Sequence, residues 1–174
     1  MLIVFSGKRG VGKTTAARYL ALNYGFTILS FATKLRQIAD FIYPGISGYY
    51  KEKPFPGHDW TPREFLIGLG AFMRYWETDY WLNQVKLQVA PSKNLVIDDC
   101  RFKNEANLMK DLGGILVRID RYESENPYKG KIDDPSETEL DNYDKFDYRI
   151  NEVENLTIAT LQRKLDYILQ DTKS

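Results

Sequence analysis

The fold of this chain is decided by the stretch Leu2-Ile3-Val4-Phe5-Ser6-Gly7-Lys8-Arg9-Gly10-Val11-Gly12-Lys13-Thr14. A short apolar run leads into an octet, Gly7 to Thr14, that fits the pattern G-x-x-x-x-G-K-[ST] without a mismatch. In this pattern a buried strand feeds a loop whose backbone N–H groups converge on phosphate oxygens, and a helix leaves the loop. The flanking residues predict that strand and that helix. The sequence therefore predicts a loop that binds the phosphates of a nucleotide.

Each position of the octet has an expected role. Its glycines let the backbone approach the ligand without a Cβ in the way. We expect Lys13 to reach the β- and γ-phosphates of the nucleotide, and the Thr14 hydroxyl to hold Mg²⁺. The predicted nucleotide-binding residues are Gly7, Arg9, Gly10, Val11, Gly12, Lys13, Thr14 and Thr15.

Length and composition indicate a single α/β domain over residues 1–174. The chain has 24 Lys and Arg residues and 24 Asp and Glu residues. This balance argues against a non-specific binder of nucleic acid polymers, which usually carries a clear basic excess. One cysteine, Cys100, excludes an intramolecular disulfide and a cysteine-based zinc site. No apolar run approaches membrane-spanning length, so a soluble cytoplasmic protein without a membrane partner is expected.

The order strand, loop, helix, strand, helix at the start of the chain predicts a parallel sheet with helical crossovers. We expect a three-layer α/β/α fold of the P-loop NTPase class with five parallel strands. Apolar periodicity predicts helices at residues 13–23, 33–43, 61–76, 79–90, 104–112 and 156–169 and strands at 2–5, 26–31, 94–100, 115–119 and 146–150. Gly25 is expected to end the first helix, and Thr61-Pro62-Arg63-Glu64 has the residues of a capping box with Pro at the first helical position.

A second acidic motif follows the apolar run Leu95 to Ile97, which ends in Asp98 and Asp99. Such a strand typically places a carboxylate beside the phosphate loop, where it orders Mg²⁺. Neighbouring strand residues face opposite ways, so only one of the two carboxylates need face the metal. We assign the metal to Thr14 and Asp99, and the sequence leaves Asp98 open.

The helix that begins near Thr61 carries a pair of arginines, Arg63 and Arg74, on one face. Eleven residues span about 16 Å along a helix, so the two arginines cannot both bind one phosphate unless the helix bends near Gly68 and Gly70. A solvated arginine face is the alternative.

Two segments lack periodicity. Residues 44–60 form a long loop with the single histidine, His58, for which a rim position is expected and catalysis is left open. Residues 121–140 are polar, with Arg121 at their start, and predict a lid-like cover over the nucleotide, with a plain solvated insertion as the alternative. Within the single domain we expect a substrate-binding helical segment at about 44–90.

Several stretches together resemble the bacteriophage-type deoxynucleoside monophosphate kinases, over nearly the whole chain. Asp99-Cys100-Arg101-Phe102-Lys103-Asn104-Glu105-Ala106 is similar to that family's D-V-R-F-P-N-E-A. The other matching stretches are Ser6 to Thr15, Phe31 to Leu35, Thr61 to Leu66, Gly68 to Gly70 with Arg74, Gly113-Gly114, Arg118 to Arg121, Ser136-Glu137 and Ile150-Asn151. The chain departs from the family where Thr14 replaces a frequent Asp, where Asp134 stands in place of a histidine, and where Lys103 replaces a proline.

The resemblance implies a fold like that of nucleoside monophosphate kinases. It also implies transfer of the γ-phosphoryl group of ATP to a (deoxy)nucleoside monophosphate, with Mg²⁺, for deoxynucleotide supply. The acceptor is already a phosphate, so positive charge and exclusion of water matter more than a strong base. The residues assigned to catalysis are Lys13, Arg101 and Arg121. Those assigned to the substrate are Arg36, Arg63, Arg74, Trp81, Asp99 and Arg101. Trp81 or Tyr80 is a candidate for stacking on the base, with core packing as an equal alternative.

Two other readings of the sequence stay open. One is a kinase of another small phosphorylated metabolite, of the dephospho-coenzyme A or phosphomevalonate type. The other is a P-loop switch or motor that hydrolyses a nucleotide, although the sequence has no N-K-x-D guanine motif. The accepted bases and the oligomeric state, a homodimer included, cannot be read from the sequence. If a phage encodes the chain, the host cytoplasm is the expected location.

Overall fold

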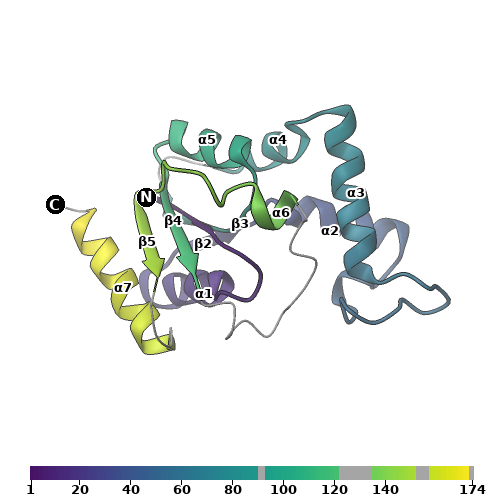
Figure 1. Cartoon of the computed structure of the whole chain (residues 1–174), viewed down its shortest axis with the longest axis horizontal. Helices are drawn as coiled ribbons and strands as arrows, with labels where there is room; N and C mark the ends of the chain where they lie inside the picture. Colours follow the sequence, from purple (N-terminus) through teal and green to yellow (C-terminus); the bar gives the residue numbers. More distant parts are fainter. Residues whose placement is uncertain (90–92, 122–134, 152–156, 173–174) are drawn as a thin grey trace. The chain divides into compact units, whose positions relative to one another are not determined.

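The computed structural model describes residues 1–89, 93–121, 135–151 and 157–172 (Figure 1). The chain folds into two compact units. The first consists of Met1–Ser30 and Ala90–Ser174, and the second of Phe31–Val89. Most of the predicted lid, residues 122–134, lies outside the described residues.

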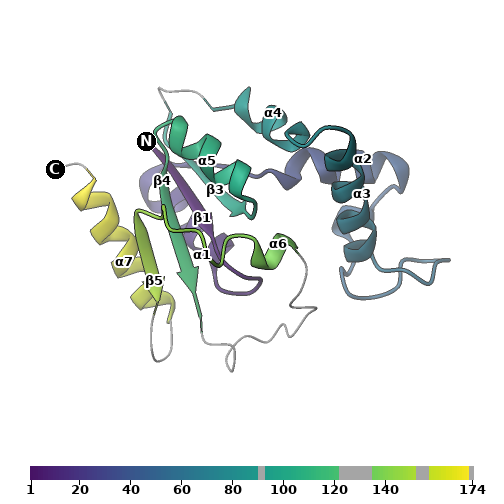
Figure 2. The ribbon, with the colours of Figure 1, turned by 45° about the horizontal axis from the view of Figure 1, so that its top comes forward.

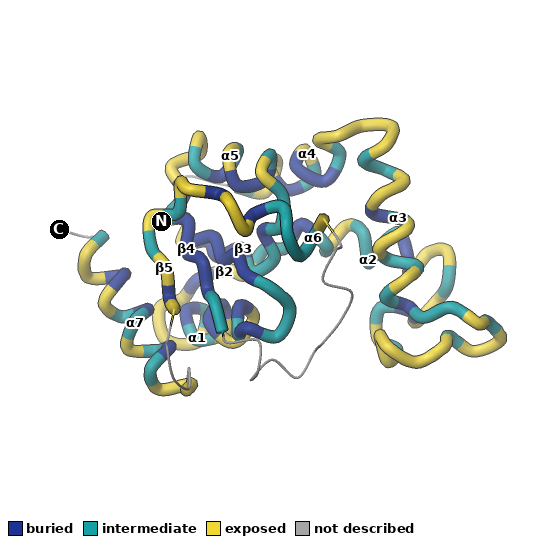
Figure 3. Tube along the Cα trace, viewed as in Figure 1, coloured by how far each residue is buried: buried dark blue, intermediate teal, exposed yellow. Residues whose placement is uncertain are grey.

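The first unit is built on a five-stranded parallel sheet in the order β2-β3-β1-β4-β5. Its strands are β1 (Leu2–Ser6), β2 (Thr27–Leu29), β3 (Leu95–Cys100), β4 (Ile115–Asp120) and β5 (Tyr148–Asn151). The central strand β1 is buried along its whole length, because it has strands on both edges and helices on both faces. The flanking strands β3 and β4 are mostly buried as well, as the dark blue tube at their labels shows (Figure 3). The predicted α/β class with five parallel strands is confirmed.

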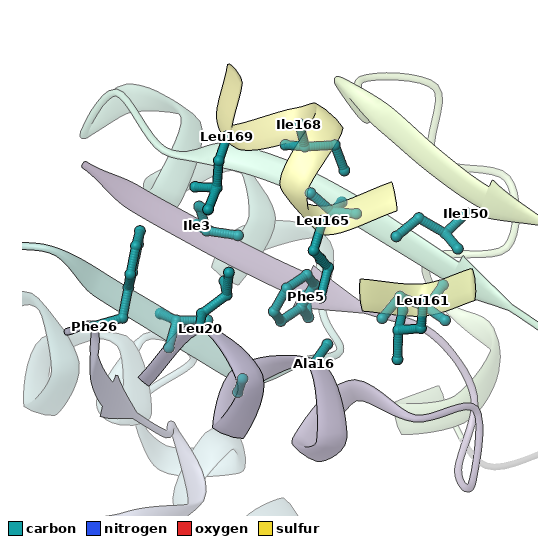
Figure 4. Close-up of a cluster of buried hydrophobic side chains, with 14 of the residues drawn as sticks. Ile3, Phe5, Ala16, Leu20, Phe26, Ile150, Leu161, Leu165, Ile168 and Leu169 are labelled. Atoms are coloured by element: carbon teal, nitrogen blue, oxygen red, sulfur yellow. The ribbon is translucent and has the colours of Figure 1, made fainter. Parts of the chain in front are cut away.

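One face of this sheet is covered by α1 (Lys13–Tyr24) and α7 (Ile158–Asp171). Ile3 and Phe5 of β1 pack there against Leu20 of α1 and Leu165 of α7 (Figure 4). Side chains alternate along a strand, so Leu2 and Val4 face the other way. That second face is covered by α5 (Lys103–Asp111), which is seen on the opposite side of the sheet from α1 and α7 in Figure 2. The first unit therefore has the predicted three layers.

The strand order places two predicted motifs side by side. β3 lies between β2 and β1, so the carboxyl end of β3 is adjacent to the loop that follows β1. In parallel α/β sheets ligands bind outside the carboxyl ends of the strands, where the chain order switches direction. The phosphate loop and the Asp98-Asp99 pair meet at such a place.

The second unit consists of α2 (Ala32–Ile42), the short 3-10 helix η1 (Ile46–Gly48), α3 (Pro62–Trp76) and α4 (Tyr80–Lys86). The Thr61 side chain accepts a hydrogen bond from the Glu64 amide, and Glu64 accepts from the Thr61 amide, so the predicted capping box is confirmed. α3 runs without interruption past Gly68 and Gly70. α4 is shorter than the predicted helix 79–90, because the chain already turns at Leu87 and Gln88.

The loop between η1 and α3 is held together by aromatic side chains. His58 stacks on Trp60 with 4.4 Å between ring centroids, and both rings contact Phe55 and Tyr43. His58 is half-buried among these rings, so it packs the loop together. This accounts for an aperiodic segment that nevertheless adopts a definite path.

Among the described residues, no helix is long and apolar enough to cross a membrane.

Candidate active site

The phosphate loop has the backbone that its glycines predict. Gly7 has φ of 140° and Gly12 has φ of 106°, a region that favours glycine. At Gly7 the need is also steric, because a Cβ would collide with the Ile119 carbonyl oxygen of β4. The loop can therefore pass close to β4 only with glycine at this position.

Lys13 lies over the loop that it follows. Its Nζ donates hydrogen bonds to the carbonyl oxygens of Gly7, at 2.6 Å, and of Lys8, at 2.8 Å, and the side chain is buried. Burial lowers the pKa of Lys13 to about 8, the charge of Arg101 acts in the same direction, and the carboxylates Glu137, Asp99 and Asp98 oppose it. The ammonium is thus held in a poorly solvated place, which increases its attraction for a phosphate.

The two acidic residues of β3 have different hydroxyl partners. Thr14 donates from Oγ1 to Asp98 Oδ2 at 2.9 Å, whereas Ser30 donates from Oγ to Asp99 Oδ2 at 2.5 Å. A hydroxyl of the phosphate loop and a carboxylate at the end of the neighbouring strand form the usual protein ligand pair for Mg²⁺ in P-loop proteins. The contact with Thr14 favours Asp98 over the predicted Asp99 for that pair, and it leaves Asp99 beside β2.

Arg101 follows directly after β3, and its backbone is fixed by Glu105 of α5. The buried Glu105 carboxylate accepts hydrogen bonds from the amides of Arg101 and Phe102, at 2.8 and 3.1 Å. This contact explains the spacing of arginine and glutamate in the stretch from Asp99 to Ala106, since the glutamate holds the turn that carries the arginine.

The guanidinium of Arg101 is held by a segment far away in the sequence. Its Nη1 donates to Glu137 Oε1 at 2.5 Å and to the Ser136 carbonyl oxygen at 3.0 Å, both in the short helix α6 (Pro135–Thr138). The other oxygen of Glu137 accepts from the amide of Arg9 in the phosphate loop at 2.8 Å. An anionic oxygen thus binds a loop N–H group, which is the chemistry that a phosphate oxygen requires.

The remaining predicted residues of the first unit lie around this centre. Val11 is buried in the core, and Thr15 is exposed at the start of α1. Arg121 follows β4 and is half-buried, at the edge of the described residues.

The predicted substrate residues of the second unit have the following surroundings. Arg63 donates from Nε to Glu52 at 2.7 Å, and Arg36 is half-buried on α2. Arg74 is half-buried, and its Nη1 is 3.4 Å from the place where a Cβ on Gly70 would lie, so the missing side chain at Gly70 gives the guanidinium its space.

Trp81 is a core residue in this structure. Its indole is 1% exposed, and its Nε1 donates to the Gly70 carbonyl oxygen at 3.2 Å. A ring with both faces buried has none left for a base, so the structure favours the core-packing alternative over the predicted stacking role.

The sequence did not predict three features of the candidate site, namely the contacts of Ser30, those of Glu137, and the pairing of Thr14 with Asp98. Ser30 and Glu137 reach the site across 69 and 128 residues of chain, so no local pattern identifies them. The only signal for Glu137 was its place in the Ser136-Glu137 match.

A phosphate loop after β1, an acidic strand end beside it, and the sheet order of the first unit define a P-loop kinase. No family model matches the chain. A protein of Acanthamoeba polyphaga mimivirus that carries the provisional name deoxynucleotide monophosphate kinase is 31% identical over 188 residues, which cover 91% of this chain and 90% of the viral protein. The chain belongs to the same family as this viral protein.

Solved structures of shikimate kinases share the fold. The enzyme from Aquifex aeolicus superposes with a TM-score of 0.53 at 14% identity, over 99% of this chain and 98% of that one. The enzyme from Acinetobacter baumannii, in complex with shikimate, gives a TM-score of 0.51 at 17% identity, over 98% and 93% of the two chains. At such low identity this likeness concerns the fold alone.

Proposed function

We propose that the protein transfers the γ-phosphoryl group of ATP to a deoxynucleoside or nucleoside 5'-monophosphate, giving the diphosphate. The observation that carries the proposal is the arginine after β3. Arg101 lies at the phosphate loop, tied through Glu137 to the Arg9 amide. A cation at this place can contact both the γ-phosphate of ATP at the loop and the phosphate group of an acceptor beside it. The family relation to the viral protein supports the same substrate class.

The donor half of the proposed reaction uses the phosphate loop. Its amides and the Lys13 ammonium bind the β- and γ-phosphates, because they are fixed donors in a sheltered place. Thr14 and Asp98 are the side chains that would hold Mg²⁺, which would neutralise part of the phosphate charge when bound. Their hydroxyl and carboxylate are 2.9 Å apart and fit the oxygen ligands that this ion prefers.

The acceptor half of the proposed reaction needs positive charge between two polyanions. We assign Arg101, and Arg121 after it, to the charge that develops on the transferred group. Arg36, Arg63 and Arg74 of the second unit are assigned to the phosphate of the acceptor, through bidentate hydrogen bonds. No general base is required, because the attacking oxygen belongs to a phosphate that is already ionised.

A panel of acceptors tests the proposal. Release of ADP from ATP and Mg²⁺ is followed in a coupled assay with each ribo- and deoxynucleoside monophosphate, and with shikimate, dephospho-coenzyme A and phosphomevalonate. Stimulation by one or more nucleoside monophosphates is expected. A rate that no nucleoside monophosphate changes would refute the proposed function, and stimulation by another acceptor alone would replace it.

The variant Arg101→Ala tests the assigned role in the same assay. We expect kcat to fall at least about a hundredfold while ATP binding changes little, because the guanidinium serves the transferred group. Arg163→Ala, at an exposed position on α7, is the matched control. Loss of ATP affinity without loss of kcat would place Arg101 on the donor side instead.

A further inference from the structure

Glu137 joins two parts of the candidate active site that are not neighbours in sequence. Oε2 accepts from the Arg9 amide at 2.8 Å, and Oε1 accepts from Arg101 Nη1 at 2.5 Å. Each carboxylate oxygen therefore has its own donor. Since Nη1 of Arg101 also donates to the Ser136 carbonyl oxygen, the direction of the guanidinium is fixed by two acceptors on adjacent residues.

These contacts are sheltered from solvent. The side chain of Glu137 is 15% exposed, and that of Arg101 is 27% exposed. Charge-assisted hydrogen bonds of this kind are shorter and about twice as strong as neutral ones. The contact is therefore strong enough to determine where the arginine points.

The segment that carries Glu137 is anchored by two acidic residues that follow it in the chain. Glu139 accepts from the Lys103 amide at 2.8 Å, at the start of α5. Asp141 accepts from Nη2 of the buried Arg118 in β4 at 2.7 Å, and it lies 3.8 Å from Lys8 Nζ. The position of Glu137 is thus set by independent contacts to β4, α5 and the phosphate loop.

We propose that Glu137 is a positioning residue for phosphoryl transfer, which holds the Arg101 guanidinium beside the phosphate loop and keeps the Arg9 amide in register with it. The inference rests on the proposed function for its kinetic consequence, but the contact itself can be tested without it. Arg101 has a long flexible side chain, and a misplacement of about 1 Å in an active site can cost a hundredfold in rate.

One alternative explains the same contacts differently. A carboxylate on a loop amide occupies a place that a phosphate oxygen could take, so Glu137 could be an anion that the nucleotide displaces. The two explanations predict opposite kinetics. Removal of a displaced anion would strengthen ATP binding and leave kcat unchanged, whereas removal of a positioning residue lowers kcat.

The variant Glu137→Gln separates them. A glutamine keeps the size of the side chain but has only one acceptor oxygen, so it cannot serve both the Arg9 amide and Arg101. We expect kcat to fall about tenfold to a hundredfold, with KM for ATP within about twofold of the wild type. In the Arg101→Ala background the same change should lower kcat much less, because the guanidinium that Glu137 positions is gone and only the contact with the Arg9 amide remains to be lost. Asp144→Asn removes an equal charge from an exposed position seven residues further along the chain and should leave kcat unchanged.

A second readout does not depend on the reaction. The amide resonance of Arg9 in a ¹H–¹⁵N spectrum should shift in Glu137→Gln and stay in place in Asp144→Asn. An unmoved Arg9 resonance, a lower KM for ATP at unchanged kcat, or an equal loss of kcat with and without Arg101 would each overturn the inference. If the wild type phosphorylates no nucleoside monophosphate, the proposed function fails, and the Arg9 resonance still decides whether Glu137 holds the loop.

Discussion

Replacement of Lys13 by methionine tests the energetics of the phosphate loop. Burial lowers the pKa of Lys13 from 10.5 to about 8, so the folded protein disfavours the ammonium by about 3 kcal/mol relative to the unfolded chain. Methionine removes that cost, but the carbonyl oxygens of Gly7 and Lys8 lose the donor that they have now, at about 1 kcal/mol each. We expect Lys13→Met to be as stable as the wild type at pH 7, or up to about 1 kcal/mol more stable.

The stability difference between the wild type and Lys13→Met should depend on pH. Between about pH 8 and pH 10.5 Lys13 is still protonated in the unfolded chain but largely neutral in the folded protein. The unfolded state therefore binds more protons, and the free energy of unfolding of the wild type gains from this group as the pH rises through that window. Methionine does not titrate. The free energy of unfolding of the wild type, relative to that of the variant, should thus rise by about 2 kcal/mol between pH 7 and pH 9.5.

Urea unfolding at pH 7 and pH 9.5, followed by circular dichroism, measures both quantities. Lys145→Met, at an exposed position, is the matched control and should show no such dependence on pH. Phosphoryl transfer by Lys13→Met should fall at least about a hundredfold, because a fixed positive charge at the phosphates is lost. A variant that is more than about 1 kcal/mol less stable than the wild type at pH 7 would refute the reasoning, as would a stability difference that does not change with pH.

Two further predictions concern the backbone and the metal. Gly7→Ala should lower the free energy of unfolding by more than about 3 kcal/mol, because the new Cβ collides with the Ile119 carbonyl oxygen and the positive φ adds strain. Gly25→Ala is the control, since a Cβ there meets open space. It should lower the free energy of unfolding by only about 1 kcal/mol in the same urea experiment. Asp98→Asn should raise the Mg²⁺ concentration for half-maximal activity about tenfold or more, since second-sphere and ligand carboxylates contribute at that level. Asp99→Asn should change that requirement much less, and the reverse order in a Mg²⁺ titration would restore the assignment to Asp99.

Much of the fold follows from local patterns in the sequence. The apolar run before Gly7 predicts a buried strand, and the glycines of the octet have the positive φ angles that the loop requires. Gly25 caps α1 with φ of 70°, and Thr61 and Glu64 form the predicted capping box. These features depend on residues within one turn or loop, so the sequence carries their whole cause.

The choice between Asp98 and Asp99 could not be made from the sequence, for a structural reason. Ile97 of β3 is paired with Val4 of β1, but Cys100 is paired with Ser6, so β3 has one extra residue between these two pairs. A bulge of this kind breaks the alternation of side chains along a strand. The alternation argument fails at the two acidic residues, and it is the contact with Thr14 that favours Asp98.

Contacts between residues far apart in the chain could not be predicted from the sequence either. Tyr80 and Trp81 begin a short helix, and helical periodicity does not say which of the two faces the core. The bond from Trp81 to the Gly70 carbonyl oxygen joins α4 to α3 and places the indole inside. Glu137 is a similar case, because an exposed-looking glutamate in a polar segment gives no sign of a partner 128 residues away.

The charges around Lys13 show how much positive charge the candidate site offers to a polyphosphate. Four charged groups act on its pKa, the guanidinium of Arg101 and the carboxylates of Glu137, Asp99 and Asp98. With Lys13 included, three negative groups face two positive ones, so this cluster alone has no excess of positive charge for a polyphosphate. The loop amides supply part of the attraction through their dipoles. We expect Mg²⁺ and cations outside this cluster to supply the rest. Loss of a carboxylate near Lys13 should therefore strengthen nucleotide binding, unless that carboxylate also holds or positions a cation.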